Sequence, residues 1–181
     1  MNPLLTQIEG TIVYSCVQKA VRGYKDPAAT EEPGMEWKTS VVVTDEEYVD
    51  SLEEAMKEAN AKGISIKKVK STDFEDKFKC ELPEGAGSKV WVLTVRKGTT
   101  LGKTGKEVPE IYRPKIFQQI KNTRVDITYD EDKIVGNGSY GKVSIDPFTR
   151  TDGSVQLYLK NTLLSTLKVY EKKADDYEPG S

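Results

Sequence analysis

Hydrophobic and polar residues alternate with a period of two over most of the chain, and the clearest alternation lies between Gly136 and Lys160. Two alternating segments there are separated by Thr151, Asp152 and Gly153, residue types that favour a tight turn. One face of both segments is aliphatic: Val143, Ile145, Val155, Leu157 and Leu159. The other face carries Lys142, Ser144, Phe148, Arg150, Gln156, Tyr158 and Lys160. The pattern predicts a β-hairpin with a buried face and an outer face rich in rings and cations.

The length of the hairpin loop decides whether these two faces align. A two-residue loop at 152–153 would set hydrophobic residues of one strand opposite polar residues of the other, because a one-residue slip turns every side chain over. A three-residue loop at 151–153 aligns the faces, and Gly153 can take the positive φ that this loop needs. Its expected cross-strand pairs are Phe148 with Gln156, Asp146 with Tyr158, and Ser144 with Lys160. We favour the three-residue loop, although a bulge at Pro147 would also restore the register.

The rest of the chain is predicted to consist mainly of short strands. We expect them over 11–17, 37–43, 64–70, 77–82, 89–96, 124–129 and 163–170. One long helix follows a capping box at Thr44 and Glu47 and stops at Gly63, with Leu52 and Ala55 on its apolar side. Many short strands, one helix and no regular βα alternation predict a mainly β protein built as a small barrel or sandwich.

Residues 98–123 are expected to form a long loop rich in glycine and lysine. Loops of this length without regular structure are usually functional or disordered. Aromatic and basic side chains are interleaved in its second half: Tyr112, Arg113, Lys115 and Phe117. Such interleaving suits a segment that follows a phosphate backbone and stacks on bases, although Phe117 could also serve only to anchor the loop.

The net charge of −2 hides an uneven distribution along the chain. Residues 1–63 have a balance of −6, residues 64–173 a balance of +7, and residues 174–181 a balance of −3. The basic part coincides with most of the predicted sheet, so the overall acidity does not exclude a nucleic-acid ligand. Lysines on exposed strand faces also keep β-proteins soluble, so charge alone leaves both interpretations open.

Several classes of function are disfavoured by what the sequence lacks. There is no histidine, the commonest general base and metal ligand, and there is no P-loop, GxSxG or CxxC motif. The acids of 130–132 are expected to be a solvated turn. Cys16 and Cys80 are both expected in strands as free thiols in a reducing compartment. Neither a membrane-spanning run nor a signal peptide is expected.

Two segments resemble a known family, the single-stranded-DNA-binding proteins of short-tailed lytic coliphages and their relatives. The stronger match runs from Gly136 to Tyr170. It includes a glycine-rich strand start, Pro147 followed by Phe148, and the strand Gly153-Ser154-Val155-Gln156-Leu157-Tyr158-Leu159. A weaker match covers residues 37–59. The resemblance implies an oligonucleotide-binding (OB-fold) β-barrel with one long helix inserted between strands.

The resemblance also implies a function and a setting. It implies binding of single-stranded DNA without base specificity, in phage replication and recombination. We expect the host cytoplasm as the setting, and no catalysis, cofactor or metal. Replication proteins would be partners through an acidic C-terminal tail. Here residues 1–173 are expected to form one domain. Family members carry a long acidic tail that ends in an aromatic residue, whereas the tail at 174–181 is short and ends on Gly-Ser. Either this tail was shortened or this relative lacks the long tail. The segment 98–123 has no counterpart in the family.

The candidate nucleic-acid contacts combine the hairpin, the basic loop and three further positions. They are Tyr158, Phe148, Lys142, Arg150, Lys160, Tyr112, Arg113, Lys115, Phe117, Arg124, Lys79 and Trp37. Trp37 also alternates with hydrophobic residues and is expected to be at least half in the core. The alternative hypothesis is a phage structural or protein-interaction β-module whose hairpin faces a protein. A nuclease is disfavoured because no carboxylate cluster is placed to hold two metal ions.

Overall fold

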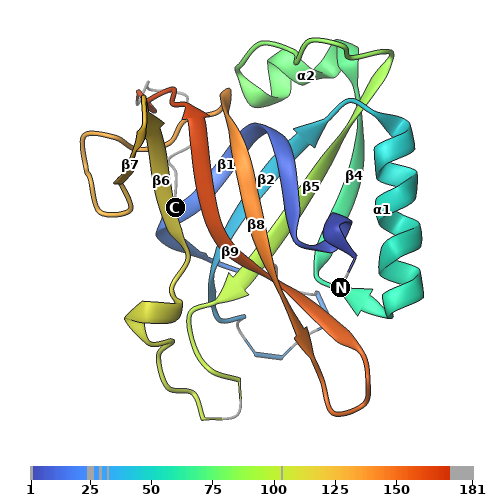
Figure 1. Ribbon diagram of the computed structural model, residues 1–181, viewed down its shortest axis with the longest axis vertical. Helices are drawn as coiled ribbons and strands as arrows, with labels where there is room; N and C mark the ends of the chain where they lie inside the picture. Colours follow the sequence, from blue (N-terminus) through green and yellow to red (C-terminus); the bar gives the residue numbers. More distant parts are fainter. Residues whose placement is uncertain (1, 24–26, 29, 32, 103, 172–181) are drawn as a thin grey trace.

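A computed structural model describes residues 2–23, 27–28, 30–31, 33–102 and 104–171 (Figure 1). The predicted fold class is confirmed: the protein is mainly β, with 49% strand and 17% helix, and is consistent with an OB-like fold with a helix. The acidic tail at 174–181 lies outside the described residues.

Nine strands, two α-helices and two short 3-10 helices make up the described part of the chain. The N-terminal half contains η1 (Pro3–Leu5), β1 (Gln7–Arg22), β2 (Met35–Val43), α1 (Glu46–Ala59), β3 (Ala61–Lys62), β4 (Ile64–Lys70) and α2 (Ser71–Phe78). The C-terminal half contains β5 (Lys89–Gly98), η2 (Glu110–Tyr112), β6 (Lys115–Ile120), β7 (Thr123–Asp126), β8 (Ser139–Thr149) and β9 (Val155–Thr166). Among these residues no helix is long and apolar enough to cross a membrane.

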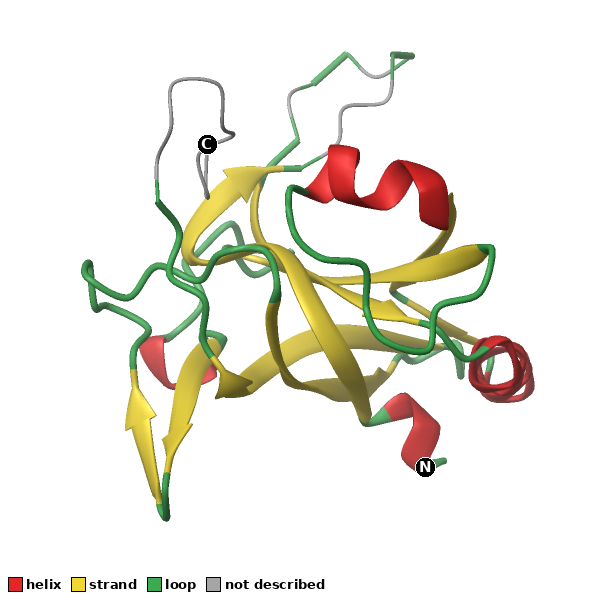
Figure 2. Cartoon of the chain, turned by 90° about the horizontal axis from the view of Figure 1, so that it is seen from above, coloured by secondary structure: helices red, strands yellow, loops and turns green. Residues whose placement is uncertain are grey.

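All strands belong to one sheet with the order β4-β5-β2-β1-β8-β9-β6-β7, and β3 pairs with β9. Viewed from above, the sheet curls around a common interior (Figure 2). The curl brings β5 into contact with β9, although pairing between the described strands does not close a barrel. The interior is filled by fully buried side chains such as Leu93, Leu157 and Leu159, and α1 adds Leu52 at one side. The polar face of the hairpin is therefore on the outside of the curled sheet.

The long helix begins and ends at residues that the sequence analysis did not select. Its N-cap is Asp45, whose carboxylate accepts hydrogen bonds from the backbone N–H groups of Glu47 and Tyr48, so the predicted capping box at Thr44 is wrong. Asn60, in the left-handed conformation, ends the helix in place of Gly63. Gly63 instead permits a close approach to β9: at its φ of 121°, a Cβ would lie 2.3 Å from the carbonyl oxygen of Leu157.

The strand predicted at 77–82 is wrong, because residues 71–78 form α2. Phe74 and Phe78 lie four residues apart on one side of this helix and are buried in a second, smaller core on the outer face of the sheet. Lys79 follows in the left-handed conformation, and Cys80 lies in the next loop, so the expectation of a strand cysteine holds only for Cys16. Formation of this helix therefore depends on burying Phe74 and Phe78 against strands that include distant parts of the sequence.

The long loop predicted at 98–123 is shorter in the structure, because β6 occupies residues 115–120. β6 pairs in parallel with β9 and antiparallel with β7. The separate strand expected at 163–170 is also wrong. β9 continues without a break to Thr166, and beyond it Val169 forms an isolated bridge with Val135.

The three-residue hairpin loop is confirmed. Arg150 donates its backbone N–H to the carbonyl of Ser154 at 2.8 Å, and Gly153 has a φ of +88°. The predicted pairs Phe148–Gln156 and Asp146–Tyr158 are present. The third predicted pair, Ser144–Lys160, is wrong, because a register shift lies between Val143 and Ile145. There the Ser144 hydroxyl donates to the carbonyl of Asn161 at 3.0 Å and accepts from its N–H at 3.2 Å.

Candidate nucleic-acid interface

The outer face of β8 carries aromatic, cationic, hydroxyl and carboxylate side chains at every second position: Tyr140, Lys142, Ser144, Asp146 and Phe148. Lys142 and Phe148 are exposed there as predicted, Phe148 by 57%. Tyr140 occupies the same face two residues before Lys142, with 41% of its surface exposed. Sequence reasoning missed Tyr140, although the alternation that placed Lys142 outward also applies to it.

A row of side chains crosses this face from β1 to β7. The strand registers place Glu9 opposite Lys142, Lys142 opposite Leu163, Leu163 opposite Phe117 and Phe117 opposite Asp126. Cross-strand neighbours in a sheet lie close enough for side chains to touch. The row therefore has an ammonium and a ring at its centre and carboxylates at its two ends.

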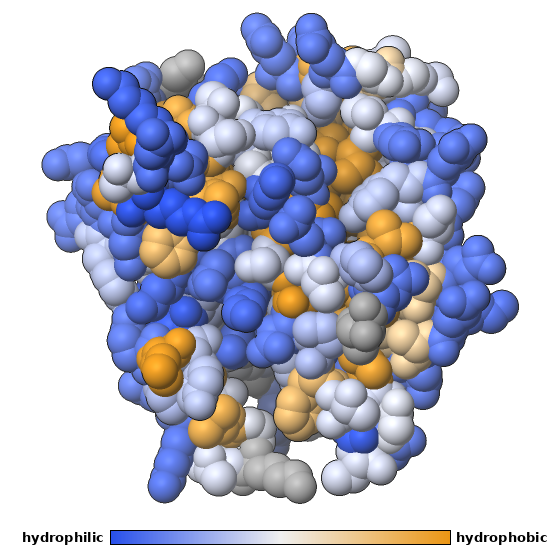
Figure 3. All heavy atoms as spheres, viewed as in Figure 1, coloured by the Kyte–Doolittle hydropathy of each residue, from blue (hydrophilic) through white to orange (hydrophobic). Residues whose placement is uncertain are grey.

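A groove of about 310 Å³ opens along this row. It is lined by Gln7, Phe117, Arg124, Lys142, Ser144, Asn161, Thr162 and Leu163. Three predicted contact residues, Phe117, Arg124 and Lys142, meet here from β6, β7 and β8. Figure 3 shows hydrophobic atoms among strongly hydrophilic ones over the β6–β7 side of this face. We call the groove lined by these eight residues the cationic groove.

The predicted residues of the hairpin lie on the same outer face, closer to its loop. Tyr158 is half-buried and opposite Asp146, whereas Lys160 is exposed. The guanidinium of Arg150 donates to the side-chain carbonyl of Gln156 at 3.3 Å. Lys115 lies beside the groove, and its backbone N–H donates to the Asn161 side chain at 3.1 Å. These side chains do not line the groove, and the Asp146 carboxylate lies among them.

Two other predicted contacts, Arg113 and Trp37, are engaged with each other away from the groove. Arg113 donates from Nη2 to the carbonyls of Val17 at 3.1 Å and Gln18 at 3.4 Å. Its guanidinium carbon lies 5.4 Å from the centroid of the Trp37 ring and 4.5 Å from that of Tyr129. Trp37 is only 8% exposed. Both residues thus contribute to the packing between β1, β2 and the segment before β6.

Tyr112 and Lys79 also lie outside the groove. Tyr112 is 63% exposed in η2, and its carbonyl accepts a hydrogen bond from the Lys97 ammonium at 2.8 Å. Burial lowers the pKa of Lys97, and the charge of Asp146 opposes that shift. Lys79 ends α2 and forms an exposed ion pair with Asp76 at 3.8 Å. No residue of α2 lines the groove.

The described part of the chain contains no group of three or more His, Cys, Asp or Glu side chains that could hold a metal ion. The polar groups of the groove are ammonium, guanidinium, hydroxyl and amide groups, which bind anions and hydrogen-bond to neutral polar atoms. A ring beside these cations adds a surface on which a flat group can stack.

Among solved structures, the chain is similar to phage single-stranded-DNA-binding proteins, at low sequence identity and with TM-scores below 0.5. The single-stranded DNA-binding protein from bacteriophage Enc34, solved in complex with ssDNA, is 15% identical, with a TM-score of 0.45 over 97% of this chain and 88% of that chain. The single-stranded DNA-binding protein gp2.5 of bacteriophage T7 is 15% identical, with a TM-score of 0.43 over 94% of this chain and 91% of that chain. No protein-family model and no curated protein matches the sequence.

Proposed function

We propose that this protein binds single-stranded DNA without catalysing a reaction and with little overall sequence preference. The observation that carries the proposal is the cationic groove, where Lys142, Arg124 and the Phe117 ring meet from three strands. Cations beside a half-buried ring suit a ligand that alternates charged phosphates with flat bases. The sequence resemblance described above supports the same class of ligand.

In the proposed mechanism, the affinity for single strands comes from two interactions, phosphate contacts by cations and stacking of bases on rings. Lysine and arginine side chains replace counterions along the phosphate backbone, which makes the affinity strongly dependent on salt. Each base that stacks on a ring adds about 1–3 kcal/mol regardless of its identity. Phe117, Phe148 and Tyr158 are the rings proposed for stacking, and Lys142, Arg124, Lys115, Lys160 and Arg150 are the proposed phosphate contacts.

The biological setting is part of the proposal. Such a protein would protect exposed single strands during phage replication and recombination in the host cytoplasm. Replication proteins would be reached through the acidic residues at 174–181, which lie outside the described part of the chain.

A fluorescence titration with oligo-dT, repeated at two salt concentrations and with a duplex of equal length, tests the proposal. Single strands should bind more tightly than the duplex, and affinity should fall steeply with salt. Arg124→Gln combined with Lys142→Gln should reduce the slope of log K against log salt by about 1.4, at about 0.7 for each lost phosphate contact.

Lys57→Gln on the exposed face of α1 is the control for each of the two single substitutions, because it removes one positive charge on the side of the molecule opposite β6 and β7 (Figure 1). Its slope should remain that of the unchanged protein. Equal affinity for duplex and single strand would refute the proposal. No binding of either oligonucleotide would favour the protein-interaction alternative.

A further inference from the structure

The end of the β8–β9 hairpin carries a second group of cations around a ring. Phe148 on β8 lies opposite Gln156 on β9, and Gln156 lies opposite Lys62 on β3. Arg150 joins this row from the loop, because its guanidinium donates to the Gln156 side chain at 3.3 Å. Figure 1 shows this end of the hairpin projecting past the rest of the sheet. We call Lys62, Phe148, Arg150 and Gln156 the hairpin cluster.

The charged groups and the ring of the hairpin cluster are available to a ligand. Phe148, Lys62 and Arg150 are all exposed. Within the described part of the chain, neither cation forms an ion pair. The carboxylate of the loop, Asp152, accepts hydrogen bonds from the N–H and the hydroxyl of Ser154, at 2.9 and 2.6 Å. Exposed cations beside an exposed ring suit one phosphate–base unit of a single strand.

The hairpin cluster and the cationic groove lie on one continuous face. Lys142 of the groove and Phe148 of the cluster both point outward from β8 and are six residues apart, which is about 20 Å along a strand. Tyr158, half-buried, and Lys160, exposed, lie between them on β9. A strand bound in the groove could therefore continue over a ring and a cation to the cluster.

One carboxylate, Asp146, lies on this path opposite Tyr158. A cation from β5 lies near it: burial lowers the pKa of Lys97, and the charge of Asp146 raises that pKa. The ammonium of Lys97 therefore offsets part of the repulsion that Asp146 exerts on a phosphate.

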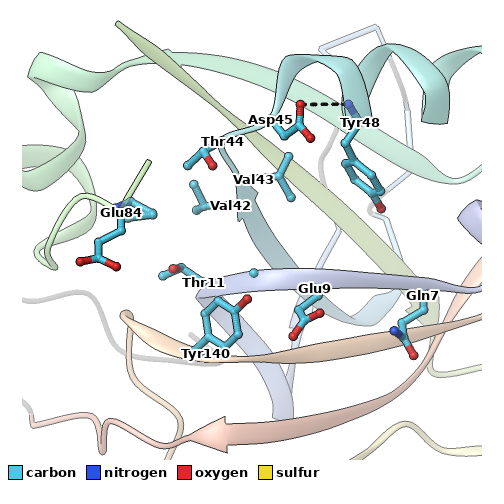
Figure 4. A pocket seen from close by; sticks show the side chains of 12 residues that line it. Gln7, Glu9, Thr11, Val42, Val43, Thr44, Asp45, Tyr48, Glu84 and Tyr140 are labelled. Atoms are coloured by element: carbon cyan, nitrogen blue, oxygen red, sulfur yellow. Dashed lines mark hydrogen bonds between the residues drawn. The ribbon is translucent and has the colours of Figure 1, made fainter. Parts of the chain in front are cut away.

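The opposite direction along β8 is unfavourable for a phosphate backbone. There the start of β8 borders a cleft of about 790 Å³, whose charged lining residues are Glu9, Asp45 and Glu84. Figure 4 shows these three carboxylates around the cleft. Because like charges repel, a strand that leaves the cationic groove gains more by running toward the end of the hairpin.

We propose that the hairpin cluster is a second nucleotide subsite, in which a base stacks on Phe148 and the phosphates beside it contact Lys62 and Arg150. One bound strand runs along the outer face of the hairpin from the cationic groove to this subsite. The inference rests on the proposed binding of single strands. It adds Lys62 to the contacts, a residue that sequence reasoning missed because only the pairing of β3 with β9 brings it to this row.

The separation of the two subsites sets the shortest strand that can reach both. Neighbouring nucleotides are about 3.4 Å apart in a stacked strand and roughly twice as far apart in an extended one. A gap of about 20 Å therefore needs at least about three such steps. A trinucleotide, with two steps, can occupy only one subsite, whereas a strand of 12 nucleotides reaches both.

Fluorescence titrations with oligo-dT of three and of 12 nucleotides test the inference. The unchanged protein should bind the longer strand at least about 100-fold more tightly, because the second subsite is then reached within one complex. The ten positions that a trinucleotide can take on the longer strand account for only about tenfold of this ratio. Lys62→Gln combined with Phe148→Ala should reduce the ratio to about tenfold and change trinucleotide binding by no more than about twofold.

Lys62→Gln alone should also flatten the slope of log K against log salt for the longer strand by about 0.7, the value for one phosphate contact. Lys70→Gln is its matched control, because Lys70 is an exposed lysine at the end of β4 next to α2, far from the hairpin loop (Figure 1). It should keep both the ratio and the slope. Circular dichroism checks that each variant is folded, and Phe148→Leu replaces Phe148→Ala if that variant unfolds.

Each outcome decides the inference. A ratio that stays near 100-fold in the double variant would overturn it and leave the proposed function standing, since the groove would then bind the whole strand. A ratio of about tenfold in the unchanged protein would also overturn it. An equal loss of slope in Lys62→Gln and Lys70→Gln would reduce Lys62 to a general contribution of charge and overturn its assignment. Failure of both oligonucleotides to bind would overturn the inference and the proposed function together.

Discussion

Arg113 offers a decisive test of the interface, because the sequence predicts a phosphate contact and the structure shows the guanidinium bonded within the protein. Its Nη2 donates to two carbonyls of β1, Val17 and Gln18, and the cation lies over the rings of Trp37 and Tyr129. We propose that Arg113 anchors the segment before β6 to the sheet and that Arg113→Ala removes this anchor.

The expected loss follows from these contacts. A hydrogen bond from a charged donor contributes about 1.5–3 kcal/mol, and the two bonds count as one because they share a nitrogen. The two ring contacts add roughly 0.5–1 kcal/mol each, the value for exposed pairs, because Arg113 itself is only half-buried. Relaxation of the loop recovers part of this sum, so Arg113→Ala should destabilise the fold by about 2–3 kcal/mol. The melting temperature should fall by roughly 4–12 °C.

Urea unfolding measures the stability, and oligo-dT titration at two salt concentrations measures the phosphate contacts. Arg113→Ala should unfold at lower urea and keep the salt slope of the unchanged protein. Arg124→Ala, at an exposed position in the groove, should do the reverse and flatten the slope by about 0.7. Arg113→Lys should rescue stability only partly, because lysine lacks the planar fork. Full stability of Arg113→Ala together with a flattened slope would refute the reasoning.

Three further predictions concern the hairpin and its neighbours. Leu157→Ala truncates a fully buried side chain and should lower the free energy of unfolding, measured in urea, by about 2–5 kcal/mol. Tyr158→Ala should instead weaken oligo-dT binding by about 1–3 kcal/mol. A reversal of these two effects would mean that bases bind on the other face of the hairpin. Gly63→Ala should destabilise the fold strongly in urea unfolding, because the new Cβ would collide with the backbone of β9. Gly87→Ala is the control and should change the stability little, because no atom lies within 4 Å of its Cβ. Equal effects of the two substitutions would contradict the packing argument. Hydrogen bonds from Ser154 lower the pKa of Asp152. The ionised carboxylate therefore stabilises the turn at pH values above the ordinary carboxyl pKa, and this stabilisation is lost as the pH falls through the lowered pKa of the folded state. An NMR titration that gives Asp152 an ordinary pKa would contradict this prediction.

Local features of the sequence were sufficient for the hairpin and for the long helix. Alternation with a period of two placed Leu157 inside and Tyr158 on the outer face, because neighbouring side chains of a strand point to opposite sides. The three-residue loop followed from the alignment of the two apolar faces, and Gly153 takes the positive φ that this loop needs. The apolar spacing of α1, including Leu52 and Ala55, predicted the helix, although its cap moved by one residue to Asp45.

The two elements that the sequence pattern did not predict, α2 and β6, depend on contacts between segments that are distant in the sequence. The α2 segment has too few residues to show a helical period, and its helix depends on the burial of Phe74 and Phe78 against strands far away in the sequence. The β6 segment was expected to be loop because its pairing partner, β9, lies more than forty residues downstream.

The functional site divides in the same way. The sequence by itself determined the residue types, the two faces of the hairpin and the concentration of basic charge in the C-terminal part. The tertiary structure alone decided that Phe117, Arg124 and Lys142 share one groove while Arg113 packs against Trp37. The physical reason is that alternation fixes the side of a strand on which a residue lies, whereas strand order and register fix which residues become neighbours.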